Sequence, residues 1–234
     1  GECSHPDEVM YVMSLTHFRA PVIEYCGGTE IGGSYVSATL VQDHCPSTFT
    51  TPCLGIDFVV LNPDRSVTQP GQHGEIFIIP PSIGLSETLL HRNHDEEYYV
   101  NEKCHCDQFG RGLRCHGDQF LVLKNGYYQA LGRADDTMKL GGIKVGAAEL
   151  ERAMAVHKSV SEVAVIGLQL DHGQTQLIAF VVPVPNGPAI QPHKLQADLQ
   201  ELLRERLNPL FKVNDVRIIN AIPKTPTNKT MRRV

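Results

Sequence analysis

The spacing of apolar and polar positions divides the chain into two regions. Between residues 52 and 130, short apolar runs such as GIDFVVLN and GEIFIIPP are separated by turns rich in proline, glycine and asparagine. Runs of this length, bounded by turn residues, are typical of β-strands. We therefore predict a small antiparallel, barrel-like sheet here. Upstream, residues 6–15 have helical spacing, and a short apolar strand then runs into a glycine-rich turn.

The pattern changes beyond residue 132. Segment 193–210 is the clearest helix, because its leucines recur near 3.6-residue spacing, and segment 147–157 has a similar pattern. Apolar runs at 160–169, 176–184 and 215–223 predict strands. The order indicates a compact α+β domain of about 100 residues. The whole chain is therefore predicted to be α+β, with domains at 1–131 and 132–234.

Composition limits the function classes. Apolar residues make up 41% of the 234-residue chain, which is enough for a packed core, and the formal charge of −5 argues against a general nucleic-acid binder. No apolar run approaches the roughly 18 residues of a membrane-spanning helix, so we expect no transmembrane segment. Seven cysteines at scattered spacings indicate reduced thiols in an intracellular compartment.

The carboxyl end is locally basic, because residues 216–234 contain five basic groups and no acid. Two prolines are expected to hold this tail extended, with Lys229 near its tip. Such a tail is commonly disordered or a solubility device. The alternative is an arm that delivers one ammonium group to a negatively charged reaction centre.

Four stretches carry candidate chemistry. GGTEIGG places Thr29 and Glu30 among four glycines, which allow backbone N–H groups to approach a phosphate, and Glu30 is an oxygen ligand suited to Mg²⁺. The alternative is an ordinary glycine turn. RCHGD offers Asp118 as an acceptor for sugar hydroxyls. GRADDTMKLGGIKV joins the two domains and contains an arginine, two adjacent acids and a Gly-Gly step. The alternative is a solvated interdomain linker without a function of its own. CHCDQFGRGLRCHGD contains cysteines and histidines, but its irregular spacing favours free thiols over zinc.

These motifs, in this order and followed by PKTPTNKTMRR, resemble the acyl-adenylate-forming superfamily, also called the AMP-dependent synthetases and ligases. The stretches IEYCGGTEIGG, NPLFKVNDV and TNKTMRRV are most similar to plant peroxisomal-type acyl-activating enzymes, close to acetyl-CoA synthetases. The resemblance covers essentially the whole chain but only the C-terminal part of the family's length. It therefore implies a C-terminal segment: the end of the large AMP-binding domain, then a mobile small domain.

The resemblance implies an AMP-forming acid–thiol ligase that adenylates a carboxylic acid with ATP and Mg²⁺ and then transfers the acyl group to CoA. It implies the following residue roles: Lys229 catalytic, Thr29 and Glu30 on phosphate and Mg²⁺, Asp118 on ribose, Arg133 on ribose and phosphate, Asp135 as hinge, and Gly142 lining the thiol tunnel. Arg232 and Arg233 are expected to contact the large domain or solvent.

Two positions depart from the family pattern. Cys26 stands where an aromatic residue is common, and Gly27 stands at a position that is bulky in acetate-specific relatives. Cys26, one of the two acyl-pocket residues, implies the loss of a stacking contact with the adenine or acyl group. Gly27 implies an acyl pocket with room for a medium-length, branched or aromatic acid. The resemblance places the protein in peroxisomes or cytoplasm, in fatty acid metabolism.

Other hypotheses remain open. The chain lacks the family's N-terminal phosphate loop, so we expect the isolated chain to be inactive without the missing N-terminal portion. It is alternatively a standalone nucleotide-binding or interaction module derived from the family. A third reading is that a carrier protein, rather than CoA, accepts the acyl group.

Overall fold

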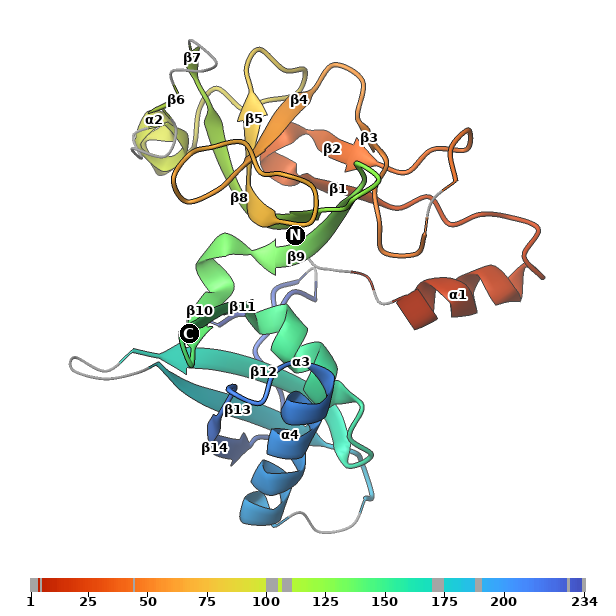
Figure 1. Ribbon diagram of the computed structural model, residues 1–234, viewed down its shortest axis with the longest axis vertical. Coiled ribbons are helices and arrows are strands. Elements are labelled where there is room, and N and C mark those ends of the chain that lie inside the picture. The colour runs from red at the N-terminus through yellow and green to blue at the C-terminus, as the bar shows by residue number, and fades with distance from the viewer. Residues whose placement is uncertain are drawn as a thin grey trace. The chain divides into compact units, whose positions relative to one another are not determined.

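The computed structural model of the chain describes residues 4, 6–43, 45–99, 105–106, 111–169, 175–187, 191–226 and 228–232, with the side chains of 105, 106 and 111 excluded. The chain folds as two compact units, Gly1–Asp135 and Asp136–Val234 (Figure 1). The boundary expected from the sequence lay after residue 131, and the division in the structure falls after Asp135.

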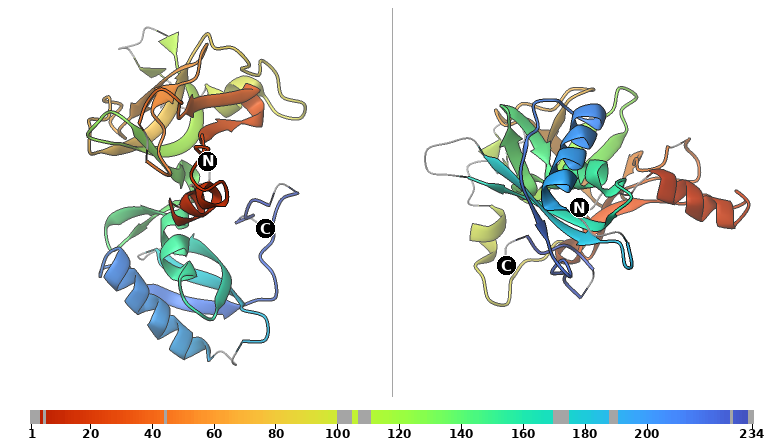
Figure 2. Two further views of the ribbon diagram at one scale, coloured as in Figure 1. Left: turned by 90° about the vertical axis from the view of Figure 1, so that its right-hand side faces the viewer. Right: turned by 90° about the horizontal axis from the view of Figure 1, so that it is seen from below.

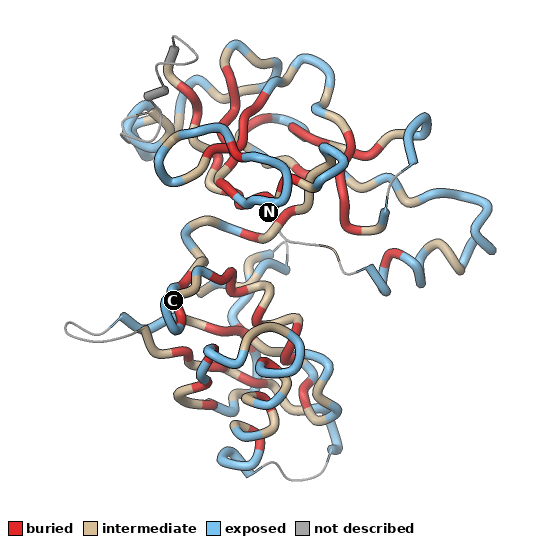
Figure 3. The backbone as a smooth tube through the Cα atoms, in the orientation of Figure 1, coloured by how far each residue is buried: buried red, intermediate tan, exposed pale blue. Residues whose placement is uncertain are grey.

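A four-stranded antiparallel sheet forms the centre of the first unit. Its strand order is β4 (Asp57–Leu61), β5 (His73–Ile79), β8 (Arg114–Val122) and β9 (Tyr128–Arg133). Successive side chains of a strand point to opposite faces. Phe58 and Val60 accordingly join one apolar cluster, and Val59 and Leu61 join another. Because both faces are covered, β4 and β5 contain uninterrupted apolar runs, and the sheet has buried segments in Figure 3.

The first unit contains further helices, turns and strands. They are α1 (Pro6–Leu15), β1 (Tyr25–Gly28), the 3₁₀ turn η1 (Thr29–Ile31), β2 (Gly33–Ser37), β3 (Thr51–Pro52), α2 (His94–Tyr98), β6 (His105–Cys106) and β7 (Arg111–Gly112). Strands β1, β2 and β3 form a second antiparallel sheet, and β6 pairs with β7. The mixed α+β class is confirmed. The barrel-like expectation is not, because the sheets of the described chain are open and none closes on itself.

The second unit begins, after the 3₁₀ turn η4 (Ala134–Asp136) at the boundary, with the hairpin of β10 (Thr137–Leu140) and β11 (Ile143–Gly146). Its main sheet has the order β12 (Val160–Leu168), β13 (Gln176–Pro183) and β14 (Val213–Ile218). Strands β12 and β13 are antiparallel, whereas β13 and β14 are parallel and joined through α4 (Pro192–Arg206). Helix α3 (Ala147–Ala155) packs beside α4.

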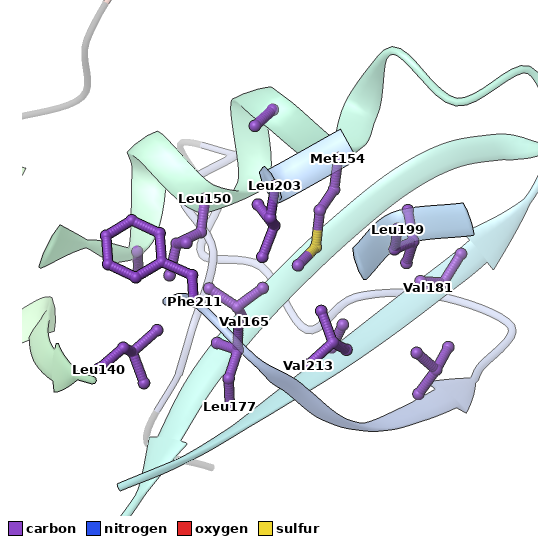
Figure 4. Close-up of a cluster of buried hydrophobic side chains, with 14 of the residues drawn as sticks. Leu140, Leu150, Met154, Val165, Leu177, Val181, Leu199, Leu203, Phe211 and Val213 are labelled. Carbon is purple, nitrogen blue, oxygen red and sulfur yellow. The ribbon is translucent and has the colours of Figure 1, made fainter. Parts of the chain in front are cut away.

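Both helices cover the same face of this sheet. Leu195, Leu199 and Leu203 recur every four residues and are buried, so they line the sheet-facing side of α4. They meet sheet residues such as Val165 and Val181 and helix α3 (Figure 4). The predicted helix at 193–210 is confirmed in its centre. It ends at Arg206, because Pro209 disfavours helical geometry in the residue before it.

The C-terminal tail follows the opposite face of the sheet from α4 (Figure 2). It is not simply extended. Lys224 and Thr230 form an isolated antiparallel bridge, and the Thr225 amide donates to the Lys229 carbonyl at 2.9 Å. Asn228 has a φ of 66°, a left-handed conformation that asparagine tolerates and that lets the chain reverse. The tail is therefore a short hairpin, and the expectation of an extended arm is corrected.

Among the described residues, no helix combines the length and the apolar character that crossing a bilayer requires.

Candidate functional site

The glycine-rich loop connects two paired strands. β1 and β2 are antiparallel and Gly28 pairs with Gly33, so η1 with Thr29 and Glu30 is the tip of this hairpin. Thr29 is exposed, whereas Glu30 is partly buried. The tip is held by the Glu30 carbonyl, which accepts the Ser86 amide at 2.9 Å. The loop therefore presents one hydroxyl and one carboxylate on a fixed backbone.

Strand β8 carries a bulge at the second candidate motif. Glu75 and Phe77 of β5 are two residues apart, but their partners Gln119 and Cys115 are four apart, so β8 has extra residues between them. Gly117 lies there with a φ of 85°, a conformation that glycine adopts without strain. Bulges re-aim side chains next to functional sites. Here the bulge turns His116 and Asp118 toward the same region.

Asp118 is the centre of a buried polar cluster. Its side chain is 1% exposed. The Tyr35 hydroxyl donates to Oδ2 at 2.7 Å, His116 Nε2 lies 3.2 Å from the same oxygen, and an Arg133 N–H donates to Oδ1 at 3.2 Å. Asp118 and Arg133 are also direct partners across β8 and β9. Burial and these contacts fix the carboxylate in place.

The partners of Asp118 determine its charge. Burial by itself raises the pKa of the Asp118 carboxyl, but the hydrogen bond and positive charge of His116, together with the Tyr35 hydroxyl, lower this pKa well below its ordinary value. Asp118 is therefore ionised at neutral pH. Burial and the neighbouring Asp118 charge conversely raise the pKa of the Tyr35 hydroxyl, so Tyr35 keeps its proton and remains a donor.

His116 links the two candidate motifs. Its Nδ1 lies 3.3 Å from Glu30 Oε1, while its Nε2 faces Asp118. The His116 ring also contacts Tyr35 edge to face, with centroids 4.7 Å apart. One imidazole thus spans the glycine-rich loop and the β8 bulge. The sequence analysis did not identify Tyr35, and it considered His116 only as a member of the cysteine- and histidine-rich segment, not as a partner of Asp118.

Arg133 forms the exposed side of the cluster. One of its N–H groups donates to the His116 carbonyl at 2.8 Å as well as to Asp118, and its Nε donates to Asp135 at 3.2 Å. A Cβ added to Gly117 would lie 2.6 Å from this guanidinium, so glycine makes room for it. Burial by itself lowers the pKa of Arg133, but the negative charges of Asp118 and Asp135 outweigh this effect. The pKa of Arg133 is therefore above its ordinary value, and the residue stays charged.

Arg114, the first residue of β8, is almost fully buried. It donates to the Ser86 hydroxyl at 2.7 Å, and its guanidinium carbon lies 4.0 Å from the centre of the Tyr98 ring. It also reaches the Glu30 carbonyl at 3.5 Å. Arg114 therefore stabilises the loop that carries Glu30, through the Glu30 carbonyl and through Ser86.

The two acyl-pocket candidates have structural surroundings of their own. Cys26 is buried, and its burial raises the pKa of the thiol although the Tyr35 hydroxyl, 2.9 Å from the sulfur, acts in the opposite direction. A Cβ added to Gly27 would lie 2.1 Å from the Gly33 carbonyl oxygen and 2.5 Å from the Ser34 Cα. The β1–β2 pairing thus requires glycine at position 27, a reason that does not involve an acyl group.

The remaining predicted residues lie at or beyond the boundary between the units. Asp135 is the last residue of the first unit. Gly142 and Gly141 form the two-residue turn between β10 and β11 with φ values of 86° and 55°, as a type I′ turn requires. Lys229 is exposed on the tail hairpin, where its amide donates to the Thr225 hydroxyl at 3.1 Å.

Arg232 forms ion pairs inside the second unit, with Glu151 at 2.7 Å and with Asp136 at 2.9 Å, and the sequence did not predict these partners. Glu151 belongs to helix α3 and Asp136 to the 3₁₀ turn η4. The expected contact of Arg232 with the large domain stays a prediction. Arg233 lies outside the described residues.

The residues suit parts of a nucleotide and its metal. Glu30 offers one hard carboxylate, and Mg²⁺ is commonly held by one or two carboxylates plus phosphates and water. No group of three or more metal-binding side chains occurs in the described residues. An ionised Asp118 suits sugar hydroxyls, but Arg133 covers one of its oxygens, so access requires movement of this half-exposed guanidinium.

The cysteine-rich segment gives no support to a zinc site within its described part. The Cys115 thiol lies 3.2 Å from Glu75 Oε1, and His116 belongs to the Asp118 cluster. Cys104 and the side chains of His105 and Cys106 lie outside the described residues.

Comparisons with known proteins follow the same division of the chain. The family of AMP-binding enzyme C-terminal domains matches residues 149–229. The chain is 41% identical to "Probable acyl-activating enzyme 17, peroxisomal" of Arabidopsis thaliana and 40% identical to "Hexanoyl-CoA synthase" of Cannabis sativa, and each alignment covers 100% of this chain and 33% of the relative.

Solved structures agree in fold. Acetoacetyl-CoA synthetase from Streptomyces lividans matches with a TM-score of 0.81 and 20% sequence identity, covering 100% of this chain and 34% of that chain. At this identity the likeness shows the fold alone. The chain spans about a third of the length of the curated relatives it matches.

Proposed function

We propose that the chain is the C-terminal segment of an ATP-dependent acyl-CoA synthetase. Its residues 149–229 match the C-terminal domain of the AMP-binding enzymes, and its relatives include plant peroxisomal acyl-activating enzymes and acetyl-CoA synthetases. The enzyme joins a carboxylic acid to AMP, releasing pyrophosphate, and then transfers the acyl group to the thiol of CoA. The observation that carries this proposal is the alignment with the Cannabis hexanoyl-CoA synthase, which covers 100% of this chain at 40% identity.

The polar cluster of the first unit binds the nucleotide. Asp118 accepts hydrogen bonds from the ribose hydroxyls, for which its ionised state is required. Arg133 contacts ribose and phosphate once it turns from Asp118 toward the substrate, and its 42% exposed side chain supports this freedom. Thr29, exposed at the tip of the β1–β2 hairpin, donates to a phosphate oxygen.

Glu30 holds Mg²⁺ in this proposal. The ion supplies positive charge to the phosphates of ATP. Glu30 contributes one carboxylate, whose position is set by the 3.3 Å contact with His116 and by the backbone contacts of its own carbonyl. Carboxylate, phosphate and water oxygens are the ligands that Mg²⁺ prefers.

Lys229 is the catalytic residue of the first half-reaction. The attacking carboxylate and the α-phosphate are both negative, and charge builds on the phosphate oxygens as they react. A compact ammonium group that contacts both lowers this barrier. The support is a hairpin that fixes the Lys229 backbone on Thr225 while its side chain stays exposed.

Two further residues serve the second half-reaction. Asp135, at the boundary between the units, is the hinge about which the second unit turns after adenylation, since a few backbone torsions suffice for such rotations. Gly142 borders the path of the CoA thiol. A Cβ added to Gly142 would meet no atom within 4 Å, so no neighbour in the described chain explains this glycine beyond its positive φ.

The acid substrate is a medium-length fatty acid, and the compartment is the peroxisome. The support comes from the names of the two plant relatives, a hexanoyl-CoA synthase and a peroxisomal enzyme. Cys26 borders the acyl or adenine group beside Asp118. Room for a longer acid does not come from Gly27, because backbone atoms of Gly33 and Ser34 occupy the space next to it.

The full-length enzyme that contains this chain provides the test. With ATP, Mg²⁺, CoA and hexanoate, we expect acyl-CoA, AMP and pyrophosphate in equal amounts, and a series from acetate to benzoate will define the acid. Binding of ATP with no AMP formed from any acid would instead support a nucleotide-binding module. AMP formation that requires a carrier protein in place of CoA would correct the acceptor.

A further inference from the structure

The Lys229 hairpin is attached to the second unit at two points. On one side, Lys224 Nζ pairs with Glu162 of β12 at 2.6 Å. On the other side, Arg232 reaches helix α3 and the first residue of the unit. Between them lie the 224–230 bridge and the turn at Asn228. Lys229 is therefore three residues from one attachment and five from the other.

The attachment at Arg232 has strong geometry. Its NH2 group donates to both oxygens of Glu151, at 2.7 and 2.9 Å, its Nε approaches Glu151 Oε1 at 3.3 Å, and its NH1 donates to Asp136 at 2.9 Å. Arginine presents a rigid planar set of donors that matches a carboxylate in this way. The side chains are 18% exposed for Arg232 and 15% for Glu151, so water screens the pair only partly.

Glu151 is fixed from a second direction. Its Oε1 also accepts the backbone amide of Val165 in β12 at 2.9 Å. Glu151 lies on helix α3 and is hydrogen-bonded to the main sheet of the second unit. Arg232 thus joins the tail to a carboxylate whose own position is fixed.

Apolar packing holds the tail only in part. Ile222 of the tail is buried, but a pocket of about 300 Å³ is lined both by sheet residues such as Ile166 and Phe180 and by tail residues such as Met231. Packing between the tail and the sheet is therefore incomplete there. The ion pairs at Lys224 and Arg232 add contacts that fix the position of the hairpin.

The second acid paired with Arg232 lies at the boundary between the units. Asp136 is the first residue of the second unit and directly follows Asp135. Arg232 therefore joins the lysine hairpin, helix α3 and the start of the unit in one contact. All of these contacts lie within the second unit, so they fix the hairpin relative to this unit.

Resting on the function proposed above, we propose that Arg232 is a positioning residue: its fork on Glu151 and Asp136 sets the location of Lys229 for adenylation. Arg232 does not touch the substrate in this scheme. It acts through Lys229 and is needed in the half-reaction that uses Lys229.

The test in the full-length enzyme separates the two half-reactions. Arg232→Lys keeps the charge but loses the fork, and we expect ATP–pyrophosphate exchange to fall about 100-fold, the loss typical of a misplacement of about 1 Å. Thioester formation from supplied acyl-AMP should stay within about twofold of the wild-type rate, since Lys229 is not used there. The matched control is Arg217→Lys, which changes an exposed arginine paired with Asp215 and should leave both rates unchanged.

A double-mutant cycle tests the route of the effect. If Arg232 acts through Lys229, Arg232→Lys added to Lys229→Ala should reduce adenylation no further. Full additivity of the two losses would overturn the proposal. So would an equal loss in both half-reactions, which is the mark of general destabilisation. An unchanged Lys229→Ala enzyme would instead refute the role proposed for Lys229.

The chain itself gives a readout that does not depend on activity. Amide hydrogen exchange at Thr225, Lys229 and Met231 reports the hairpin, because these amides donate to Lys229, Thr225 and Pro223. We expect faster exchange at all three in Arg232→Ala and no change in Arg217→Ala. Unchanged exchange in Arg232→Ala would show that other contacts fix the hairpin, and the proposal would fail.

Discussion

Asp118 and Lys229, the two charged residues at the centre of the proposed reaction, are held in opposite ways. The Asp118 carboxylate is 1% exposed and contacts Tyr35, His116 and Arg133 before any substrate arrives. Lys229 is exposed, and within the described chain its ammonium has no ion pair, although its backbone is bonded to Thr225.

This difference matches the work proposed for each residue. A binding group gains from being fixed in advance, because no reorganisation is then needed when the ligand arrives. A cation that serves one half-reaction must reach the reacting atoms and later leave them. The first unit therefore fixes a side chain, whereas the second fixes a backbone and leaves the side chain free.

The largest expected effect is on the first unit. Asp118→Ala removes the anion between His116 and Arg133 and leaves buried donors without their acceptor. Breaking one partner out of a buried charged cluster costs about 3–5 kcal/mol of unfolding free energy. Urea denaturation of the chain measures this loss. The control is Asp43→Ala, an exposed acid that should change stability by about 0.5 kcal/mol or less.

The second unit has its own weak point in the core. Leu199→Ala leaves a cavity between α4 and the sheet and should lower the unfolding free energy by about 2–5 kcal/mol. Amide hydrogen exchange should rise in α3, α4 and β12–β14 and remain unchanged in β4, β5, β8 and β9. Equal acceleration in both sets would show that the two units do not have separate stabilities. Leu210→Ala, at a 58% exposed position, is the matched control.

A smaller effect is expected at the β10–β11 turn. Gly142→Ala meets no atom but forces alanine to a φ of 86°, which costs about 1–2 kcal/mol. Gly33→Ala is the control, because a Cβ there also meets open space and its φ is not in the left-handed region. Comparison of the two thermal unfolding curves isolates backbone strain from packing. Equal midpoints would rule out strain at Gly142.

The smallest effect on stability belongs to Lys229 and completes the contrast with Asp118. Lys229→Ala removes an exposed ammonium with no ion pair in the described chain, so the unfolding free energy should change by about 0.5 kcal/mol or less. A loss comparable to that of Asp118→Ala would mean that Lys229 supports the fold, and the difference between the two residues would disappear.

The sequence predicted those features that arise from local patterns. The central strands and both helices of the second unit follow from apolar spacing. The four-residue spacing of Leu195, Leu199 and Leu203 is one example. The roles given to the lysine, acid and glycine residues by motif order stay predictions.

Features that depend on contacts between distant segments could not be predicted in this way. Tyr35 and His116 reach Asp118 only because β2 and the β8 bulge meet in three dimensions, and nothing local distinguishes Tyr35 from other core residues. The bidentate contact of Arg232 joins positions 81 residues apart in the chain. The open sheets, likewise, could not be told from a barrel, because strand spacing is the same in both.

The most direct test of the account is the Lys229→Ala form of the full-length enzyme, measured in both half-reactions under single-turnover conditions. In Lys229→Ala we expect acyl-AMP formation to fall by at least about 100-fold, because a charge that stabilises the reacting phosphate is lost. Thioester formation from supplied acyl-AMP should remain within about twofold of the wild-type rate. Adenylation at the wild-type rate would contradict the account.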